Sequence, residues 1–178
     1  MHKNLITLNK NLVTDVSICI PTFQRIDPLI RSLSSITSLN ISNLKIEVMV
    51  SSNSKLDDVV KEFILENFDD SKYKVSVFEQ DENIGMYGNW NFLLNSASSK
   101  WLTILNDDDV LDKNWINYVD NYLHSTLNNN MSLLAPSIKM FGSKIPASNS
   151  SKMNKFFQKI RFYKKDYVSL SLFDILNR

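Results

Sequence analysis

The sequence predicts an α/β fold, with a mostly parallel sheet flanked by helices on both faces. Three observations predict it: short apolar runs rich in β-branched residues, amphipathic helical spacing between those runs, and a regular alternation of the two. Parallel strands need crossover connections, and the intervening helices supply them. The length of 178 residues and the 43% hydrophobic content are those of a globular domain rather than a disordered chain.

The first strand is expected over Val16–Ile20, an apolar run that Pro21 ends. Asp27 and Pro28 then provide a helix N-cap and a proline in the first helical turn. The helix that follows has apolar residues at helical spacing: Leu29, Ile30, Leu33 and Ile36. The first unit is therefore strand, loop and helix.

The same unit recurs further along the chain. A strand is expected over Ile46–Val50, followed by the polar loop 51–54 and by a helix with Val59, Val60, Phe63 and Ile64 on one face. A third strand is expected over Tyr73–Phe78, and an Asn/Gly-rich segment over 83–91 leads into another helix. The apolar residues of that helix are Trp90, Phe92, Leu93, Leu94 and Ala97.

The last clear unit begins with a strand over Trp101–Leu105. Asp112 is expected to cap the next helix, whose apolar residues are Trp115, Ile116, Val119, Tyr122 and Leu123. Met131–Ile138 is a further candidate strand. Beyond Gly142 the pattern weakens, so we divide the chain into residues 1–142 and a basic, aromatic segment, residues 143–178.

The charge is balanced overall but uneven along the chain. The formal net charge is +1, while the eight Lys/Arg and two Asp of residues 143–178 leave −5 for residues 1–142. Because residues 1–142 are acidic, no nucleic-acid partner is expected. Residues 152–167 have the spacing of a helix with a cationic face, which either contacts an anionic membrane peripherally or packs its aromatic stripe on the sheet. The single cysteine, Cys19, and the lack of a signal peptide fit a cytoplasmic protein, with a peripheral position at the inner face of the membrane as the alternative.

Three consecutive carboxylates, Asp107, Asp108 and Asp109, directly follow the strand expected at 101–105. In an extended chain Asp107 and Asp109 would share a face and Asp108 would point elsewhere. Carboxylate oxygens suit Mg²⁺ or Mn²⁺, which complete their coordination with water and substrate phosphates. Ligands of open α/β sheets bind beyond the carboxyl ends of strands, where this cluster lies. The alternative is a solvated turn that favours the start of the next helix.

Several segments together resemble the family-2 glycosyltransferases of the GT-A fold, from about Asp15 to about Met140. The segment 16–25 is similar to the opening strand and Pro-Thr-aromatic-x-Arg loop of that family. Asn83-Ile84-Gly85, with Asn89, Trp90 and Asn91, resembles its Asn-x-Gly loop and succeeding helix. The segment 101–109 resembles its D-x-D strand. The resemblance implies that residues 1–142 are the Rossmann-like donor-binding part and that most of the acceptor-binding half is absent.

The resemblance also implies roles for individual residues. A UDP- or dTDP-linked sugar donor would bind with Mg²⁺ or Mn²⁺, Asp109 and Asp107 being the metal residues and Asp107 also approaching the ribose or sugar. The residues assigned to the nucleotide-sugar are Pro21, Thr22, Arg25, Ser52, Asn53, Asn83, Gly85, Asn89, Asp107 and Asp108. The alternative for Arg25 is a surface arginine at a helix start, and for Asn53 a residue that tolerates a turn.

Two features depart from the family pattern. The loop after the second strand usually carries an aspartate that contacts the base, whereas here it is Ser51-Ser52-Asn53-Ser54. The family's acceptor-activating carboxylate comes from the C-terminal half, where only Asp166 and Asp174 are available and neither has a matching context. No general base is assigned.

The resulting expectation is a metal-dependent, inverting glycosyltransferase of cell-surface polysaccharide synthesis, with a saccharide or lipid-linked saccharide as acceptor. Two alternatives stay open. One is a truncated, non-catalytic fragment that binds a nucleotide-sugar. The other is a phosphoryl-transfer enzyme with Asp107 as nucleophile, since such sites also begin with an apolar strand followed by D-x-D.

Overall fold

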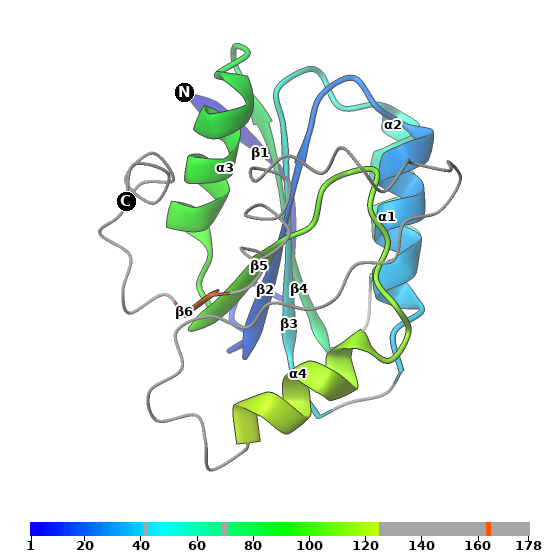
Figure 1. Ribbon diagram of the computed structural model, residues 1–178. Helices are drawn as coiled ribbons and strands as arrows, with labels where there is room; N and C mark the ends of the chain where they lie inside the picture. Colours follow the sequence, from blue (N-terminus) through cyan, green and yellow to red (C-terminus); the bar gives the residue numbers. More distant parts are fainter. Residues whose placement is uncertain (41–42, 69–70, 125–162, 165–178) are drawn as a thin grey trace, which may run out of the picture.

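The computed structural model describes residues 1–40, 43–68, 71–124 and 163–164 (Figure 1). Their strands form one sheet in the order β1-β4-β3-β2-β5-β6. The strands are β1 (His2–Leu8), β2 (Val16–Thr22), β3 (Ile46–Ser52), β4 (Tyr73–Gln80), β5 (Trp101–Ile104) and β6 (Tyr163–Lys164). The helices are α1 (Asp27–Thr37), α2 (Asp58–Asn67), α3 (Gly85–Ser96) and α4 (Trp115–His124).

The four central strands β4, β3, β2 and β5 run parallel, as the alternating pattern predicts. All seven residues of β3 are buried, and so are six of the seven in β2, because helices cover both faces. Figure 1 shows α1 and α2 on one face of the sheet and α3 on the other. The α/β prediction is confirmed.

Each face of the sheet has its own apolar cluster. The larger cluster joins β2, β3 and β4 to buried residues of α1, α2 and α4, among them Leu33, Ile64 and Ile116. The smaller cluster packs α3 on the opposite face through Leu93 and Leu94 and contains Cys19. Cys19 is fully buried and free, in agreement with its prediction as a core residue.

Several helix details differ from the sequence expectation. Asp27 is the first residue of α1 rather than its N-cap, and no side chain caps that helix. Val59 of α2 and Tyr122 of α4 were expected on apolar faces, yet their side chains are 55% and 45% exposed. The core instead buries Val60 and Ile64 of α2 and Trp115, Ile116 and Val119 of α4. Asp112 does accept a hydrogen bond from the Asn114 backbone N–H, as expected before α4.

Two strands lie outside the predicted set. β1 pairs antiparallel with β4 at one edge of the sheet, and only Ile6 of its side chains is buried, so its sequence carries little apolar pattern. β6 pairs antiparallel with β5 through Trp101 and Leu102. The helix expected over 152–167 is therefore wrong at Tyr163–Lys164, where backbone pairing with β5 overrides helical spacing. The rest of that helix, the strand at 131–138 and the boundary at 142/143 lie outside the described residues.

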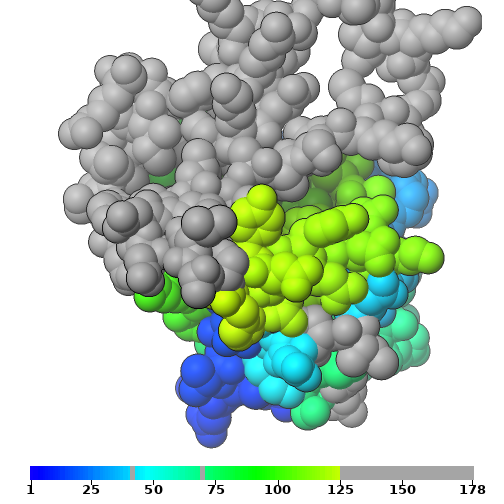
Figure 2. Space-filling view, turned by 60° about the horizontal axis from the view of Figure 1, so that its bottom comes forward, coloured from blue at the N-terminus to red at the C-terminus, as the bar shows by residue number. Residues whose placement is uncertain are grey.

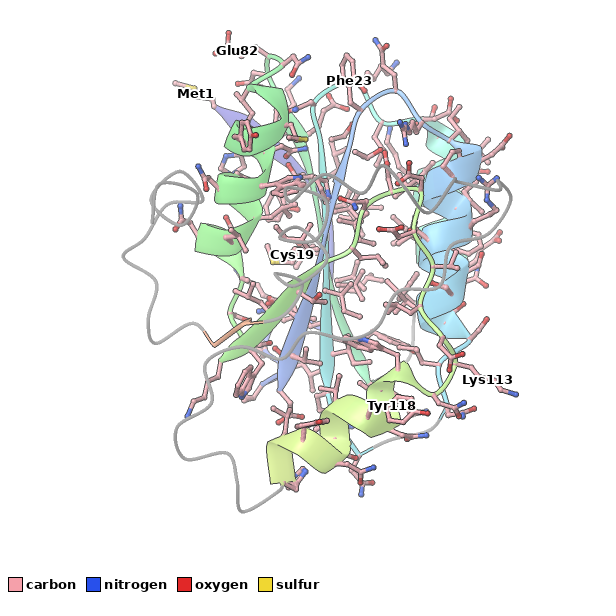
Figure 3. All side chains as sticks on the ribbon, in the orientation of Figure 1. Met1, Cys19, Phe23, Glu82, Lys113 and Tyr118 are labelled. Carbon is pink, nitrogen blue, oxygen red and sulfur yellow. The ribbon has the colours of Figure 1, made fainter. Side chains whose placement is uncertain are left out.

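Helix α4 lies across the end of the sheet at which the parallel strands begin. Figure 2 shows the residues around α4 as a continuous yellow-green surface over that end. The loops that follow β2 and β4 lie at the opposite end, where Phe23 and Glu82 are labelled in Figure 3. Within the described residues no helix is both long and apolar enough to span a bilayer.

Candidate functional site

A cavity of about 270 Å³ opens at the carboxyl end of the sheet, between the loops that follow β2 and β3. Its lining includes Thr22, Arg25, Ser52, Ser54, Lys55 and Asp57. Thr22, Arg25 and Ser52 were predicted as site residues, whereas Ser54 and Lys55 were missed. The only indication in the sequence was that both directly follow the polar end of a buried strand.

The loop between β2 and α1 directs two polar side chains toward the acidic residues. Thr22 ends β2 beside Ser52 of β3, and Pro21 pairs in the same register with Ser51. Gln24 adopts the left-handed conformation (φ 54°), which turns the chain sharply before α1. The turn leaves Arg25 at the cavity rim with its side chain 48% exposed.

The acidic residues form a turn rather than an extended segment. β5 ends at Ile104, and the Asp109 backbone N–H donates to the Asn106 carbonyl (3.1 Å), which closes a turn over 106–109. Hereafter we call these four residues the acidic turn. The expected alternation of side chains is therefore wrong, because it requires extended backbone.

Asp107 and Asp108, the first two aspartates of the acidic turn, both bond to the guanidinium of Arg25. Thr22 Oγ1 donates to Asp107 Oδ2 (2.7 Å), and Arg25 Nη1 lies 3.2 Å from Asp107 Oδ1 and 2.8 Å from Asp108 Oδ2. The hydrogen bond to Asp108, followed by the charge of Asp107, raises the pKa of Arg25 above its ordinary value. Asp108 thus lies with Asp107 and does not point elsewhere, as the sequence had suggested.

Asp109 has a different partner from Asp107. Its Oδ2 accepts a hydrogen bond from Asn106 Nδ2 (2.9 Å), so the two acids assigned to the metal are held by different groups. No cluster of three or more His, Cys, Asp or Glu able to hold a metal occurs in the part of the chain that the structure describes. Mg²⁺ bound with a nucleotide, however, needs only one or two protein carboxylates.

The loop after β3 connects the cavity to the start of α3. Ser52 is buried and accepts a hydrogen bond from the Ser54 backbone N–H (3.3 Å). The Asn53 backbone N–H donates to the Thr22 carbonyl, and its side-chain Nδ2 donates to the Gly85 carbonyl, each at 3.0 Å. Asn53 Oδ1 is buried and has no hydrogen-bond partner. An unpaired buried acceptor is costly and unusual in a folded protein.

The Asn/Gly segment builds the first turn of α3. Asn83 Oδ1 accepts from the Gly85 backbone N–H (2.9 Å), and Gly85 has φ +74°, a conformation that side chains rarely adopt. Asn89 is buried, and its Nδ2 donates to the Ser51 carbonyl (2.8 Å), while its Oδ1 has no partner. Asn53 and Asn89 thus join β3 to α3 and leave two acceptors unused.

The cavity at the carboxyl end of the sheet is therefore lined by hydroxyl groups, an arginine, a lysine and the carboxylate of Asp57. Asp107 and Asp108 bond to two of its lining residues, Thr22 and Arg25. The cationic side chains can bind an anionic ligand directly, and the carboxylates can bind its hydroxyl groups or an accompanying cation.

Comparison with known proteins gives a family and a set of similar structures. The model of the family described as Glycosyl transferase family 2 matches residues 17–171. No curated protein matches the chain. Among solved structures, residues 1–349 of S. aureus TarS are similar with a TM-score of 0.66 at 18% identity, over 85% of this chain and 47% of that one.

The same S. aureus fragment in complex with UDP is similar to the same degree, with a TM-score of 0.66 and 18% identity. The mannosyltransferase PcManGT from Pyrobaculum calidifontis, in complex with GDP-Man and Mn²⁺, has a TM-score of 0.54 at 17% identity, over 65% of this chain and 34% of that one. This chain thus spans about half the length of the S. aureus fragment, 28% of the longer S. aureus TarS chain and 34% of the mannosyltransferase. These similarities confirm the predicted GT-A fold.

Proposed function

The chain belongs to glycosyl transferase family 2, and on this premise we propose that it binds a nucleotide-diphosphate sugar and transfers the sugar to an acceptor hydroxyl. The observation that carries the proposal is the convergence of Thr22 and Arg25 on Asp107 and Asp108 beside the cavity. These residues are 82 to 85 positions apart in the sequence, and the family resemblance assigns each of them to the nucleotide-sugar.

The proposed donor is linked to UDP or dTDP and lies in the cavity, where Thr22 and Arg25 line one side and Ser52 the other. Pro21 and Asn53, next to Thr22 and Ser52 in the chain, are assigned to the same donor. The unpaired Asn53 Oδ1 supports a contact with the base, because an amide oxygen accepts the N–H that uracil and thymine both present. The ribose and sugar lie toward Asp107 and Asp108. Asn83, Gly85 and Asn89, at the start of α3, are assigned to the same donor, and Asn89 connects α3 to the end of β3 through the Ser51 carbonyl.

Arg25 exchanges partners in this proposal. Its guanidinium is half-exposed and bonded to two carboxylates, so it can rotate to the diphosphate. The Asp107 carboxylate, only 11% exposed, then keeps its hydrogen bond from Thr22 and needs a new partner for its charge. A charge-assisted bond to the diphosphate replaces the bonds to Asp107 and Asp108. The released carboxylates then become available to donor hydroxyls or a cation.

Mg²⁺ or Mn²⁺ is the proposed cofactor, with Asp109 and Asp107 as its protein ligands. Carboxylate oxygens suit either ion, and the guanidinium between Asp107 and Asp108 occupies a position that accommodates positive charge. When bound, the ion would supply charge that stabilises the departing diphosphate.

The remaining parts of the proposal are an inverting reaction, a saccharide or lipid-linked saccharide as acceptor, and a role in cell-surface polysaccharide synthesis. A cytoplasmic location with peripheral membrane contact through residues 152–167 belongs to the same proposal. Asp166 and Asp174, the acids considered as a general base, lie outside the described residues.

The test is thermal unfolding with UDP and dTDP, each with and without Mn²⁺. At a hundred times the dissociation constant, a ligand raises the unfolding midpoint of a protein of this size by roughly 5 to 10 °C. We expect this shift only when nucleotide and ion are both present, and we expect Asp109→Asn to abolish it. Glu66→Gln, an exposed acid on α2, is the matched control and should keep the shift. No shift with any nucleotide would contradict the proposal.

The two alternatives give different results with a labelled nucleotide-sugar. Binding and slow hydrolysis, without transfer to any acceptor, would favour the non-catalytic fragment. Turnover of a simple phosphate ester, lost in Asp107→Asn, would favour phosphoryl transfer.

A further inference from the structure

Helix α1 holds the backbone of the acidic turn through a buried hydroxyl. Ser32 is fully buried in the middle of α1, on the same helix face as Leu29, Leu33 and Ile36. Its Oγ donates to the Asn106 carbonyl (3.0 Å) and also contacts the Asp109 carbonyl. These carbonyls belong to the first and last residues of the acidic turn, so one side chain fixes both ends.

A second serine of α1, Ser35, bonds the chain just beyond the acidic turn. Ser35 Oγ accepts a hydrogen bond from the Leu111 backbone N–H (3.0 Å) and donates to the Ser32 carbonyl (2.6 Å). The chain leaving the acidic turn is therefore attached to the same helix. Serine is a poor residue for a helix interior, so two serines bonded to a distant segment point to a need for those bonds.

The acidic turn is consequently held from two sides. Ser32 bonds its backbone, and Ser35 bonds the backbone N–H of Leu111, two residues beyond it. The side chains of Asp107 and Asp108 meet Thr22 at the end of β2 and Arg25 in the loop before α1. Both sets of contacts come from one continuous stretch, residues 22–35. A shift of the acidic turn relative to α1 would displace both carboxylates from Arg25 and from a donor bound beside it.

We propose that Ser32 and Ser35 are positioning residues that set the two aspartates for donor binding, a role that rests on the proposed function. They touch no donor atom and act through the backbone of the acidic turn. Contacts that orient the ligands of metal sites change metal affinity or activity by about 10-fold to 100-fold when they are removed from other proteins.

The test compares three alanine variants within one helix. Ser34→Ala is the matched control, because Ser34 Oγ bonds only within α1, to the Ile30 carbonyl (2.7 Å). Calorimetric titration with UDP and Mn²⁺, at a temperature where every variant is folded, should show affinity about tenfold weaker in Ser32→Ala and unchanged in Ser34→Ala. Ser35→Ala should weaken binding and Ser35→Thr, which keeps the hydroxyl at a half-buried position, should restore it. Equal affinity in Ser32→Ala and Ser34→Ala would overturn the proposal.

Amide hydrogen exchange gives a second measurement that needs no nucleotide. The backbone N–H groups of Asp109 and Leu111 donate to Asn106 and Ser35. They should exchange faster in Ser32→Ala and Ser35→Ala than in Ser34→Ala, and unchanged exchange would overturn the positioning role. If the wild type binds no nucleotide, the proposed function fails, while faster exchange would still show that the serines fix the turn.

Discussion

The two ends of the sheet each carry a cluster of carboxylate, cation and hydroxyl groups, and the clusters differ in how completely these groups are paired. At the amino end, Glu47 of β3 is 2% exposed and accepts hydrogen bonds from Ser17, Ser98 and Lys74. At the carboxyl end, three aspartates follow β5, and Arg25 is bonded to two of them. We call these the Glu47 cluster and the Arg25 cluster.

The Glu47 cluster is a buried and closed network. Lys74 Nζ lies 2.9 Å from Glu47 Oε1, and the Ser98 backbone N–H and hydroxyl complete the partners of the carboxylate. The network joins β2, β3 and β4 to the loop before β5, with no acceptor of Glu47 left for a ligand. In contrast, the side chains of Arg25 and Asp108 are about half-exposed, and Asn53 and Asn89 nearby keep unpaired acceptors.

The difference separates polar groups that stabilise the fold from polar groups that are available to a ligand. Buried charges are tolerated only when their hydrogen bonds are satisfied, as those of Glu47 are. Incomplete pairing at the other end costs stability and is consistent with a site completed by a bound molecule.

The largest expected effect is on the Glu47 cluster. Glu47→Ala should lower the free energy of unfolding by about 3 kcal/mol, because it leaves the largely buried Lys74 ammonium without its carboxylate. Urea unfolding near neutral pH measures the change, and Glu66→Ala, at an exposed position on α2, is the control. A loss under about 1 kcal/mol would contradict the contrast between the clusters.

The second prediction concerns pH. Burial is the largest influence and raises the pKa of Glu47, but hydrogen bonds from Ser17, Lys74 and Ser98 together outweigh it, so the net pKa lies below its ordinary value. A folded-state pKa below the unfolded value gives stability that is present above about pH 4.5 and lost as the pH falls through the folded pKa. The stability difference between wild type and Glu47→Gln should therefore shrink as the pH falls below about 4.5 in urea unfolding. A constant difference would refute this linkage.

A third, smaller effect tests whether every acid at the carboxyl end is free for a ligand. Asp57 lines the cavity, yet its Oδ1 accepts the Val59 backbone N–H (2.9 Å) and caps α2. Asp57→Ala should cost about 1 kcal/mol of stability, measured by thermal unfolding. The neighbouring Asp58→Ala is the control, because Asp58 is exposed and forms an ion pair with Lys61 on the same helix. Equal midpoints for the two variants would show that the cap is dispensable.

The smallest effect on stability is expected at Arg25. Arg25 is half-exposed, its pair with Asp108 is open to solvent and salt, and Asp107 keeps its hydrogen bond from Thr22. Arg25→Ala should therefore change the free energy of unfolding by less than about 1 kcal/mol. The same substitution should weaken UDP binding, whereas Arg31→Ala, at an exposed position on α1, should leave both unchanged. A large loss of stability in Arg25→Ala would show that the Arg25 cluster stabilises the fold, as the Glu47 cluster does.

Much of the fold follows from local pattern. The four central strands and four helices were predicted close to their observed positions, because burial on both faces requires continuous apolar runs and burial on one side requires helical spacing. Motif and strand order also placed Thr22, Arg25 and Asp107 at one end of the sheet, since the loops after parallel strands lie together. β1 could not be predicted in this way, because an edge strand with one buried side chain leaves almost no pattern.

The sequence by itself determined the order of strands and helices and the end of the sheet at which the polar motifs gather. Only the tertiary structure decided that the aspartates form a turn, that Asp107 and Asp108 both bond Arg25, and that Ser32 bonds the backbone of that turn. Spacing along a chain encodes which face a residue occupies. The partner of a side chain 74 to 85 residues away depends instead on how the crossover connections bring two loops together.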